Sequence, residues 1–330
     1  MLQIKELLIG YQAPKGDKIP LLPPINLKLE KGKVCGLIGA NGAGKTTLLR
    51  TVTGYIKPLG GTIFLNGKSM ASLSNAQRAK YISVVLTDRI EDPFLQVGHI
   101  VSMGRHPYTG FMGKLQVNDE MIVQEAMELV GISHLQSNRM TTLSDGERQK
   151  VMIAKALAQN TPLIILDEPA AFLDYPSRIE LMLLLKKLAY EKEKTILLSS
   201  HDLEILMRNA DQLWLIARGK PAVEGLPEQL ILDGRLNTYF GSADLFISHD
   251  FDDTKQMNLS GTVFVESDKK SGFWIKNALS KRGFVLSQNP ESFIHINYQN
   301  NAYVIKNKNE VVCSTGSLAK LLEELSKILP

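Results

Sequence analysis

The sequence contains little of what secreted, membrane-spanning or nucleic-acid-binding proteins require. Only two of its 330 residues are cysteines, Cys35 and Cys313, and their wide separation suits neither a disulfide framework nor a metal site. No stretch approaches the ~20 apolar residues of a membrane helix. The net charge of +4 is too small to indicate nucleic acid by itself. Glu6 and the break at Gly10 do not fit a signal peptide, so we expect a cytoplasmic protein.

What the sequence does contain is an alternation of short apolar strands and helical segments. Its length exceeds one average domain. Strands that alternate with helices predict an α/β fold with a parallel sheet covered on both faces. Strands are expected at Leu2–Leu8, Ile25–Leu29, Val34–Ile38, 60–67, Tyr81–Leu86, Leu163–Leu166 and Thr195–Leu198, with a proline-rich loop between the first two, and helices at 117–130, 151–157 and 179–190.

The motif that organises the chain is GANGAGKT, Gly39 to Thr46, which fits G-x-x-x-x-G-K-[ST]. An apolar strand precedes it, and a helix follows from about Lys45. The glycines, Gly39, Gly42 and Gly44, let successive backbone N–H groups point into one concavity, and the helix N-terminus adds positive potential. A glycine-rich turn before a buried helix is the alternative, but it requires neither the preceding strand nor the Lys-Thr ending. The motif therefore predicts a phosphate-binding loop.

The residue types around this loop fit the chemistry of a nucleotide. Lys45 supplies a point charge for the β/γ-phosphates, and the hydroxyl of Thr46 is placed to bind Mg²⁺. Farther along the chain, a buried strand ends in Asp167 and Glu168. Adjacent carboxylates at that point offer one ligand for Mg²⁺ and one partner for a water molecule.

Two more pieces share the chain with these motifs in a fixed order. The segment LSDGE, Leu143–Glu147, stands before the acidic pair, and a lone histidine, His201, follows the next strand. Each piece alone is weak evidence, but the ordered set is strong. It resembles the ATP-binding-cassette (ABC) ATPases. GANGAGKTT looks like their Walker A, LSDGE like their signature, LIILDEP like their Walker B, AFLD (171–174) like their D-loop and His201 like their switch histidine.

The resemblance covers about residues 1–240 and implies both a fold and a site. The fold is a P-loop NTPase ABC cassette with a RecA-like parallel sheet core, an antiparallel β subdomain and a helical signature subdomain at about 90–160. ATP is then bound by Tyr11, Gly39, Ala40, Asn41, Gly42, Ala43, Gly44, Lys45, Thr46 and Thr47, and Mg²⁺ by Thr46 and Asp167. Glu168 becomes the catalytic glutamate, and His201 contacts the γ-phosphate. A second copy, facing head to tail, lends Ser144, Asp145, Gly146 and Glu147 in trans, and Asp174 lies in the D-loop.

Several positions depart from the family pattern or stay open. Thr87 occupies the place of the usual Q-loop glutamine, and its shorter side chain puts that metal contact in doubt. Asp145 and Glu147 replace a glycine and a glutamine of the signature. A carboxylate aimed at a phosphate is unfavourable, so Asp145 must point away or interact with the helix end. Tyr11 is either a surface aromatic or the platform on which adenine stacks.

A second domain is expected after a change in composition. Residues 1–245 are assigned to the cassette, and the Ser, Asp and Asn-rich residues 246–260 to a linker. Residues 261–330 then form a small α+β domain. Its elements are expected at 262–266 (strand), 272–281 (helix) and 284–287 (strand), then two strands around Asn300-Asn301, and a last helix with Leu318, Leu321, Leu322, Leu325 and Leu329 on one face. His295 alternates with two isoleucines and is expected to face solvent. The role of this domain is either regulatory or to help hold a dimer.

These features predict the ATPase subunit of a membrane importer on the cytoplasmic face of the membrane. The segment 101–108 (VSMGRHPY) is similar to importers of iron-siderophores, haem and vitamin B12. The implied partners are a second copy, polytopic permease subunits and, indirectly, an external substrate-binding protein, without nucleic acid. A soluble ABC ATPase of ribosomes or DNA is the alternative, although this chain has one cassette and no long coiled-coil insertion. A module that holds nucleotide without turnover is a third reading, supported only by Thr87.

Overall fold

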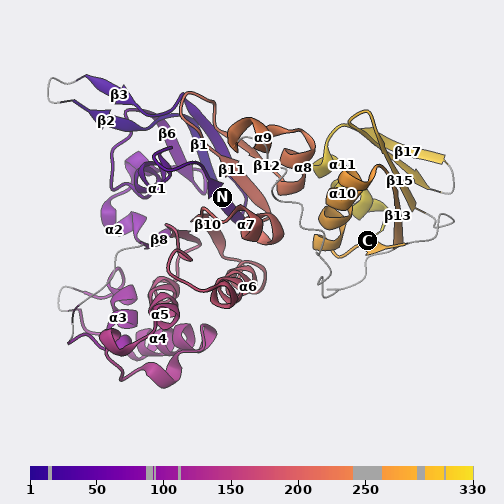
Figure 1. Ribbon diagram of the computed structural model, residues 1–330. Coiled ribbons are helices and arrows are strands. Elements are labelled where there is room, and N and C mark those ends of the chain that lie inside the picture. Colours follow the sequence, from indigo (N-terminus) through magenta and orange to yellow (C-terminus); the bar gives the residue numbers. More distant parts are fainter. Residues whose placement is uncertain are drawn as a thin grey trace. The chain divides into compact units, whose positions relative to one another are not determined.

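The computed structural model describes two compact units of the chain (Figure 1). The described residues are 1–13, 17–86, 92, 94–110, 113–240, 262–287, 294–307 and 310–329. The units are Met1–Glu224 and Gly225–Pro330. The division falls before the limits of 245 and 261 that the sequence indicated, and those domain limits remain predictions. Within the described residues, no helix is both long and apolar enough to span a membrane.

A six-stranded sheet forms the centre of the first unit, in the order β12-β11-β5-β10-β9-β8. Its strands are β5 (Val34–Ile38), β8 (Ile82–Val85), β9 (Leu163–Leu166), β10 (Thr195–Ser199), β11 (Gln212–Leu215) and β12 (Val223–Gly225). The five from β11 to β8 pair in parallel, as predicted. β5, β9 and β10 are buried along their whole length, which is typical of strands covered on both faces. Helices α6 (Tyr175–Glu191) and α7 (Leu203–Asn209) contact β5.

An antiparallel sheet packs against this centre through α1 (Lys45–Thr53). Its order is β4-β1-β6-β7, with β1 (Leu2–Leu8), β4 (Ile25–Leu29), β6 (Gly60–Leu65) and β7 (Lys68–Ser69). Short helix α2 (Asn75–Arg78) follows. The sequence predicted only a proline-rich loop between β1 and β4. The structure corrects this, because the segment contains a hairpin of β2 (Gly10–Gln12) and β3 (Lys18–Pro20). Both strands are short and mostly exposed, so they carry no apolar alternation that could reveal them.

Three helices gather away from the sheets of the first unit, as Figure 1 shows. They are α3 (Val97–Ser102), α4 (Val117–Leu129) and α5 (Asp145–Ala158), and each contacts the other two. Four short 3₁₀ segments, Met70–Ser72, Met103–Arg105, Ser133–Leu135 and Met140–Thr142, complete the unit. α5 begins at Asp145, well before the predicted 151, because Ser144 caps it. α6 likewise begins four residues before the predicted 179, capped by Asp174.

A buried ion pair fixes this helical group. Arg105 donates from Nε to Oδ1 of Asp119 at 2.9 Å and from a terminal nitrogen to the carbonyl of Ala158 at 2.8 Å. It thereby joins the start of α4 to the end of α5. Asp119 also accepts from the backbone N–H of Gln116. That hydrogen bond, together with the Arg105 guanidinium, lowers the pKa of Asp119.

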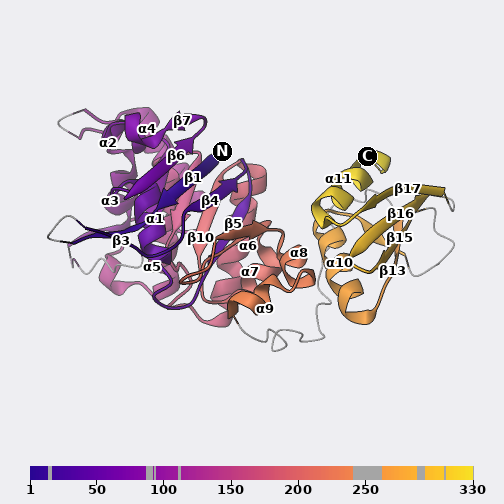
Figure 2. The same ribbon diagram turned by 90° about the horizontal axis from the view of Figure 1, so that it is seen from above.

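The second unit contains a five-stranded mixed sheet in the order β14-β13-β15-β16-β17. Its strands are β13 (Thr262–Glu266), β14 (Val285–Leu286), β15 (Ile294–Gln299), β16 (Ala302–Asn307) and β17 (Glu310–Thr315). Helices α10 (Lys269–Lys281) and α11 (Leu318–Ile328) lie on one face of it (Figure 2). β17 was not predicted, because its apolar residues are adjacent and exposed instead of alternating. His295 is half-buried, with its ring 5.3 Å from that of Phe264.

Two further helices, α8 (Pro227–Leu232) and α9 (Arg235–Phe240), belong to this unit although the sequence assigned them to the cassette. The carboxylate of Glu228 in α8 is buried and accepts from Lys281 Nζ at 2.7 Å and from Asn277 Nδ2 at 2.9 Å, both in α10. Gln229 accepts from the backbone N–H of Leu318 at the start of α11. A buried carboxylate needs such partners, so α8 is fixed to α10 and α11.

We predict that Asp119→Asn lowers the free energy of unfolding of the first unit by about 3 kcal/mol, because it leaves the buried Arg105 cation without its counterion. The ionised Asp119 stabilises the fold above its ordinary pKa of 3.8. That contribution is lost as pH falls through the lower folded pKa, so the difference between variant and wild type should narrow below pH 3.8.

The measurement is urea unfolding followed by Trp214 fluorescence in a Trp274→Phe background, because these are the two tryptophans and Trp214 lies in the first unit. Glu120→Gln removes an exposed neighbouring carboxylate and serves as the control. Equal stabilities of Asp119→Asn and the control at neutral pH would contradict the role of the pair.

Candidate nucleotide-binding site

The phosphate loop leads from the end of β5 into α1. Gly44 has φ of 103°, a left-handed conformation that a side chain disfavours, and it directly precedes the helix. A Cβ on Gly39 would lie 2.7 Å from the carbonyl oxygen of Ile216, which follows β11 in the same chain. The loop therefore approaches this segment too closely for any residue other than glycine. The outer part of the loop, Ala40, Asn41 and Gly42, is exposed, whereas Ala43 is buried beneath it.

Lys45 lies under the loop. Its side chain is buried, and Nζ donates to the carbonyl of Gly39 at 2.8 Å and to that of Ala40 at 3.5 Å. The nearest acid that pairs with it is Glu168, with Oε1 4.0 Å from Nζ. Burial lowers the pKa of Lys45, and the charges of Glu168 and Asp167 act in the opposite direction. The lysine is therefore a cation held beside carbonyl oxygens, which is a strong anchor for an anion that enters the loop.

The two carboxylates follow β9, next to the loop. Asp167 is buried, and its Oδ1 accepts from the hydroxyl of Ser199 at 2.6 Å. Ser199 ends β10 and its Oγ also accepts from the backbone N–H of Glu168 at 2.9 Å. Parallel pairing places Leu166 opposite Leu198, so residues that end the two strands lie side by side. One hydroxyl thus fixes both members of the acidic pair.

Glu168 and His201 form the outer edge of this cluster. Nε2 of His201 lies 2.5 Å from Oε1 of Glu168, and the histidine side chain is 47% exposed. Glu168 has φ of 50°, a left-handed conformation that is uncommon outside glycine. Such backbone conformations concentrate at functional sites, and this one follows directly after the buried Asp167. The cluster therefore presents a carboxylate and an imidazole toward the loop's lysine.

The aromatic and hydroxyl residues predicted for ATP lie near the start of α1. Tyr11 is in β2, is 54% exposed, and its hydroxyl lies 3.4 Å from Oγ1 of Thr47. Thr46 is half-buried in the first turn of α1. The hydroxyl of Thr46 and the carboxylate of Asp167 are oxygen donors of the kind that Mg²⁺ takes. Thr87 lies outside the described residues, and its metal contact remains a prediction.

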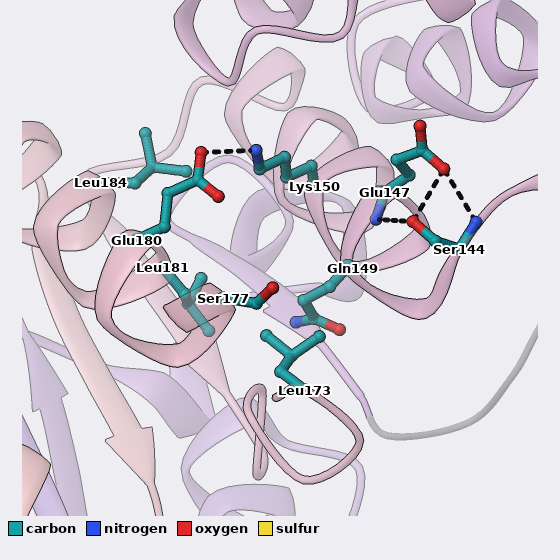
Figure 3. Close-up of a pocket in the computed structure, with 10 residues that line it drawn as sticks. Ser144, Glu147, Gln149, Lys150, Leu173, Ser177, Glu180, Leu181 and Leu184 are labelled. Atoms are coloured by element: carbon teal, nitrogen blue, oxygen red, sulfur yellow. Dashed lines mark hydrogen bonds and ion pairs between the residues drawn. The ribbon is translucent and has the colours of Figure 1, made fainter. Parts of the chain in front are cut away.

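The signature residues form a second cluster at the N-terminus of α5 (Figure 3). Ser144 and Glu147 exchange hydrogen bonds as a capping box, and Asp145 pairs with Arg148 at 3.2 Å. The Asp145 carboxylate therefore contacts the side chain of Arg148, in the same first turn of α5. A cavity of about 230 Å³ opens beside Gly146, and its lining comes from α5 and residues 173–184 without any phosphate-loop residue.

The D-loop ends where α6 begins. Asp174 accepts from the backbone N–H of Ser177 at 3.1 Å as the N-cap of that helix. Hydrogen bonds from Ser177 lower the pKa of Asp174, so it is an anion at neutral pH. In one copy of the chain, the predicted site therefore exists as two clusters, one around Lys45 and one around Ser144.

Comparisons with known proteins agree with this geometry. The family model described as ABC transporter matches residues 22–171, and that described as iron ABC transporter C-terminal domain matches residues 260–326. The chain is similar to an uncharacterised ABC transporter ATP-binding protein of Methanocaldococcus jannaschii, with 42% identity over 70% of this chain and 78% of that protein. The chain belongs to the ABC transporter ATP-binding proteins.

Other ABC relatives carry more specific names. The achromobactin transport ATP-binding protein CbrD of Dickeya dadantii is 34% identical over 72% of this chain and 86% of its own length. The iron(3+)-hydroxamate import ATP-binding protein FhuC of Bacillus subtilis is 34% identical over 72% of this chain and 87% of its length.

Solved structures of ABC cassettes share the fold. A dimeric ATP-binding cassette in a post-hydrolysis state, bound to ADP and Pi, is 25% identical with a TM-score of 0.60, and the match covers 69% of this chain and 99% of that one. The CbiO1 protein of Clostridium perfringens, part of the CbiONQ transporter complex, is 28% identical with a TM-score of 0.63, covering 72% and 95%. The family resemblance, the fold class and the assignment to ABC ATPases are thereby confirmed.

Within this ABC cassette, Ser199 is a residue that motif matching missed. It lies one residue beyond the predicted strand Thr195–Leu198 and belongs to none of the matched motifs. Its function depends on the register between β9 and β10, which a single sequence does not reveal. The available signal was a polar residue after the apolar run Ile196–Leu198, at the end of a strand where parallel sheets gather functional groups.

We predict that Ser199→Ala lowers the free energy of unfolding of the first unit by about 1–3 kcal/mol, because it leaves the buried Asp167 carboxylate without its hydroxyl donor. Urea unfolding, followed by the fluorescence of Trp214 in the Trp274→Phe background, measures this loss of stability. Ser200→Ala removes a neighbouring hydroxyl that only accepts from the Asp202 backbone, and is the control. If both variants unfold at the same urea concentration, Ser199 does not hold the acidic pair.

Proposed function

We propose that this chain is the ATP-hydrolysing subunit of a membrane importer for an iron-siderophore, haem or cobalamin. The observation that carries the proposal is the convergence of Lys45, Glu168 and His201 within one cluster at the ends of parallel strands. Relatives whose names state iron(3+)-hydroxamate import, petrobactin import and cobalamin import support the cargo class. The match of residues 260–326 to an iron ABC transporter C-terminal domain supports iron among these cargoes.

The phosphate loop binds the triphosphate of ATP in this proposal. Backbone N–H groups of Gly39 to Gly44 and the N-terminus of α1 surround the β-phosphate, with the hydroxyls of Thr46 and Thr47 beside them. Lys45 exchanges its carbonyl partners for phosphate oxygens and neutralises their charge. Tyr11 stands in an exposed hairpin at the mouth of the loop, where its ring can stack on adenine.

Mg²⁺ would be held by Thr46, Asp167 and the phosphates. Among the described residues no group of three or more histidine, cysteine or acidic side chains could hold a metal alone. That agrees with Mg²⁺, which takes few protein ligands and shares the phosphates of its nucleotide. When bound, the ion supplies charge neutralisation for the transferring phosphoryl group.

Glu168 and His201 act on the water and the γ-phosphate. The carboxylate of Glu168 accepts a proton from the attacking water and orients it, while Ser199 fixes the backbone from which it projects. His201 contacts the γ-phosphate and, through Nε2, holds the carboxylate in place. Catalysis then consists of positioning and electrostatics, without a covalent intermediate.

A second copy completes the site. Ser144 and the backbone N–H of Gly146 lie at the N-terminus of a helix of 14 residues, which suits a γ-phosphate bound to another copy. Asp145, Glu147 and the D-loop residue Asp174 complete the facing surface. The dimeric cassette among the solved structures supports this arrangement. Because each site needs both copies, ATP binding closes the dimer, and closure moves the permease.

In this proposal the protein lies at the cytoplasmic face of the cell membrane, bound to polytopic permease subunits. An external substrate-binding protein delivers the cargo to the permease. A permease and a binding protein encoded beside this chain, and a permease that co-purifies with it, are the expected observations. A partner that is a ribosome or DNA would instead favour a soluble ABC ATPase. Both the importer subunit and the soluble ABC ATPase would release phosphate from ATP, whereas a module that only holds nucleotide would not.

We predict that Glu168→Gln keeps ATP binding and slows turnover by about 10²–10⁴, the usual contribution of a positioned general base. Phosphate release and fluorescent-nucleotide titration measure the two quantities. Glu191→Gln, an exposed change on α6, is the control and should match wild type. Undiminished phosphate release by Glu168→Gln would remove this residue from the proposed role.

We also predict that Ser144→Arg prevents ATP-driven dimerisation while each copy still binds nucleotide, because a long side chain then occupies the facing surface. Size-exclusion chromatography with ATP in the Glu168→Gln background, which slows hydrolysis, detects the dimer. Ser137→Arg, an exposed serine of the same helical group, is the matched control. Normal dimers of the Ser144→Arg variant would show that the site is not shared.

A further inference from the structure

At the N-terminus of α5, Ser144 is hydrogen-bonded to Glu147 in a way that conflicts with its proposed contact with a γ-phosphate. Oε2 of Glu147 accepts from the hydroxyl of Ser144 at 2.8 Å and from its backbone N–H, also at 2.8 Å. The backbone N–H of Glu147 donates to Ser144 Oγ at 3.3 Å. Figure 3 draws these three contacts at the edge of the cavity. A serine hydroxyl has one proton, and here a carboxylate holds it.

The charge of Glu147 adds to this conflict. Hydrogen bonds from the backbone and hydroxyl of Ser144 lower its pKa, so the side chain is an anion and only accepts hydrogen bonds. The two cations nearest to it in the sequence of α5 already have carboxylate partners. Arg148 pairs with Asp145 at 3.2 Å, and Lys150 pairs with Glu180 at 2.8 Å. A phosphate that approaches Ser144 therefore meets a negative charge.

We propose that Glu147 is a positioning residue that withholds the Ser144 hydroxyl and so sets the ATP concentration at which two copies close. The inference rests on the proposed shared site. A γ-phosphate and the Glu147 carboxylate compete for one proton and repel each other, so closure requires Ser144 to exchange one acceptor for the other. The reacting water is oriented by Glu168 on the other copy. Glu147 therefore changes the ATP dependence of the reaction.

The test is Glu147→Gln in the full chain. The amide oxygen of a glutamine can still accept from the Ser144 backbone N–H, so the helix stays capped, but this neutral oxygen holds the hydroxyl proton less strongly than a carboxylate does. We expect the ATP concentration for half-maximal phosphate release to fall by about tenfold. The difference should shrink as salt rises, because screening weakens the repulsion that the variant removes. Glu128→Gln removes an exposed carboxylate on α4 and should behave as wild type at every salt concentration.

A double variant separates this role from a general effect of charge. If Glu147 acts through the Ser144 proton, the Glu147→Gln effect should be several-fold smaller in a Ser144→Ala background than in wild type. An unchanged or higher ATP requirement in Glu147→Gln would overturn the inference. An effect of equal size with and without the serine hydroxyl would also overturn it.

The same experiment distinguishes failure of the inference from failure of the proposed function. Wild-type chain that releases no phosphate at any ATP concentration would refute the proposed ATPase and with it this inference. Wild-type chain that hydrolyses ATP with a curve identical to that of Glu147→Gln would refute only the role of Glu147.

Discussion

Parallel pairing of β5, β10 and β9 is the constraint on which the rest of the structure depends. Because the strands run in one direction, the residues that follow each of them meet at one edge of the sheet. The phosphate loop follows β5, the acidic pair follows β9, and His201 follows β10. Lys45 and Glu168, which are far apart in the sequence, thus form an ion pair at 4.0 Å. A shift of one residue in this register would move every side chain of the strand to the opposite face of the sheet, where Ser199 could no longer contact Asp167, so the site depends on this register.

Charge in the cluster is balanced locally. Lys45 is buried, and burial alone disfavours a cation, but Glu168 and Asp167 supply opposite charge. Ser199 satisfies Asp167 through a hydroxyl, which adds no charge of its own. A triphosphate that enters the loop brings the negative charge for which Lys45 and the helix N-terminus are arranged. The site is therefore suited to bind an anion without a large rearrangement of its buried groups.

Much of this arrangement could be predicted from the sequence, because phosphate loops and apolar strands are local signals. β1, β4, β5 and β9 lie where the apolar runs indicated. Local signals for helix starts were also present: Ser144 stands three residues before Glu147, the spacing of a capping box. Non-local features were not predictable. The contact of Ser199 with the acidic pair depends on strand register, and β17 pairs with β16 although its apolar residues do not alternate.

The carboxylate of Glu228 has a consequence for how the chain can be divided. A protein shortened to end between residues 241 and 261 would keep α8 and lose Lys281 and Asn277, the side chains that satisfy this buried acid. The apolar Leu230, also buried, would be left facing water on the same short helix. If the two units are to be produced separately, the chain is better divided before Gly225, so that α8 stays with the C-terminal sheet.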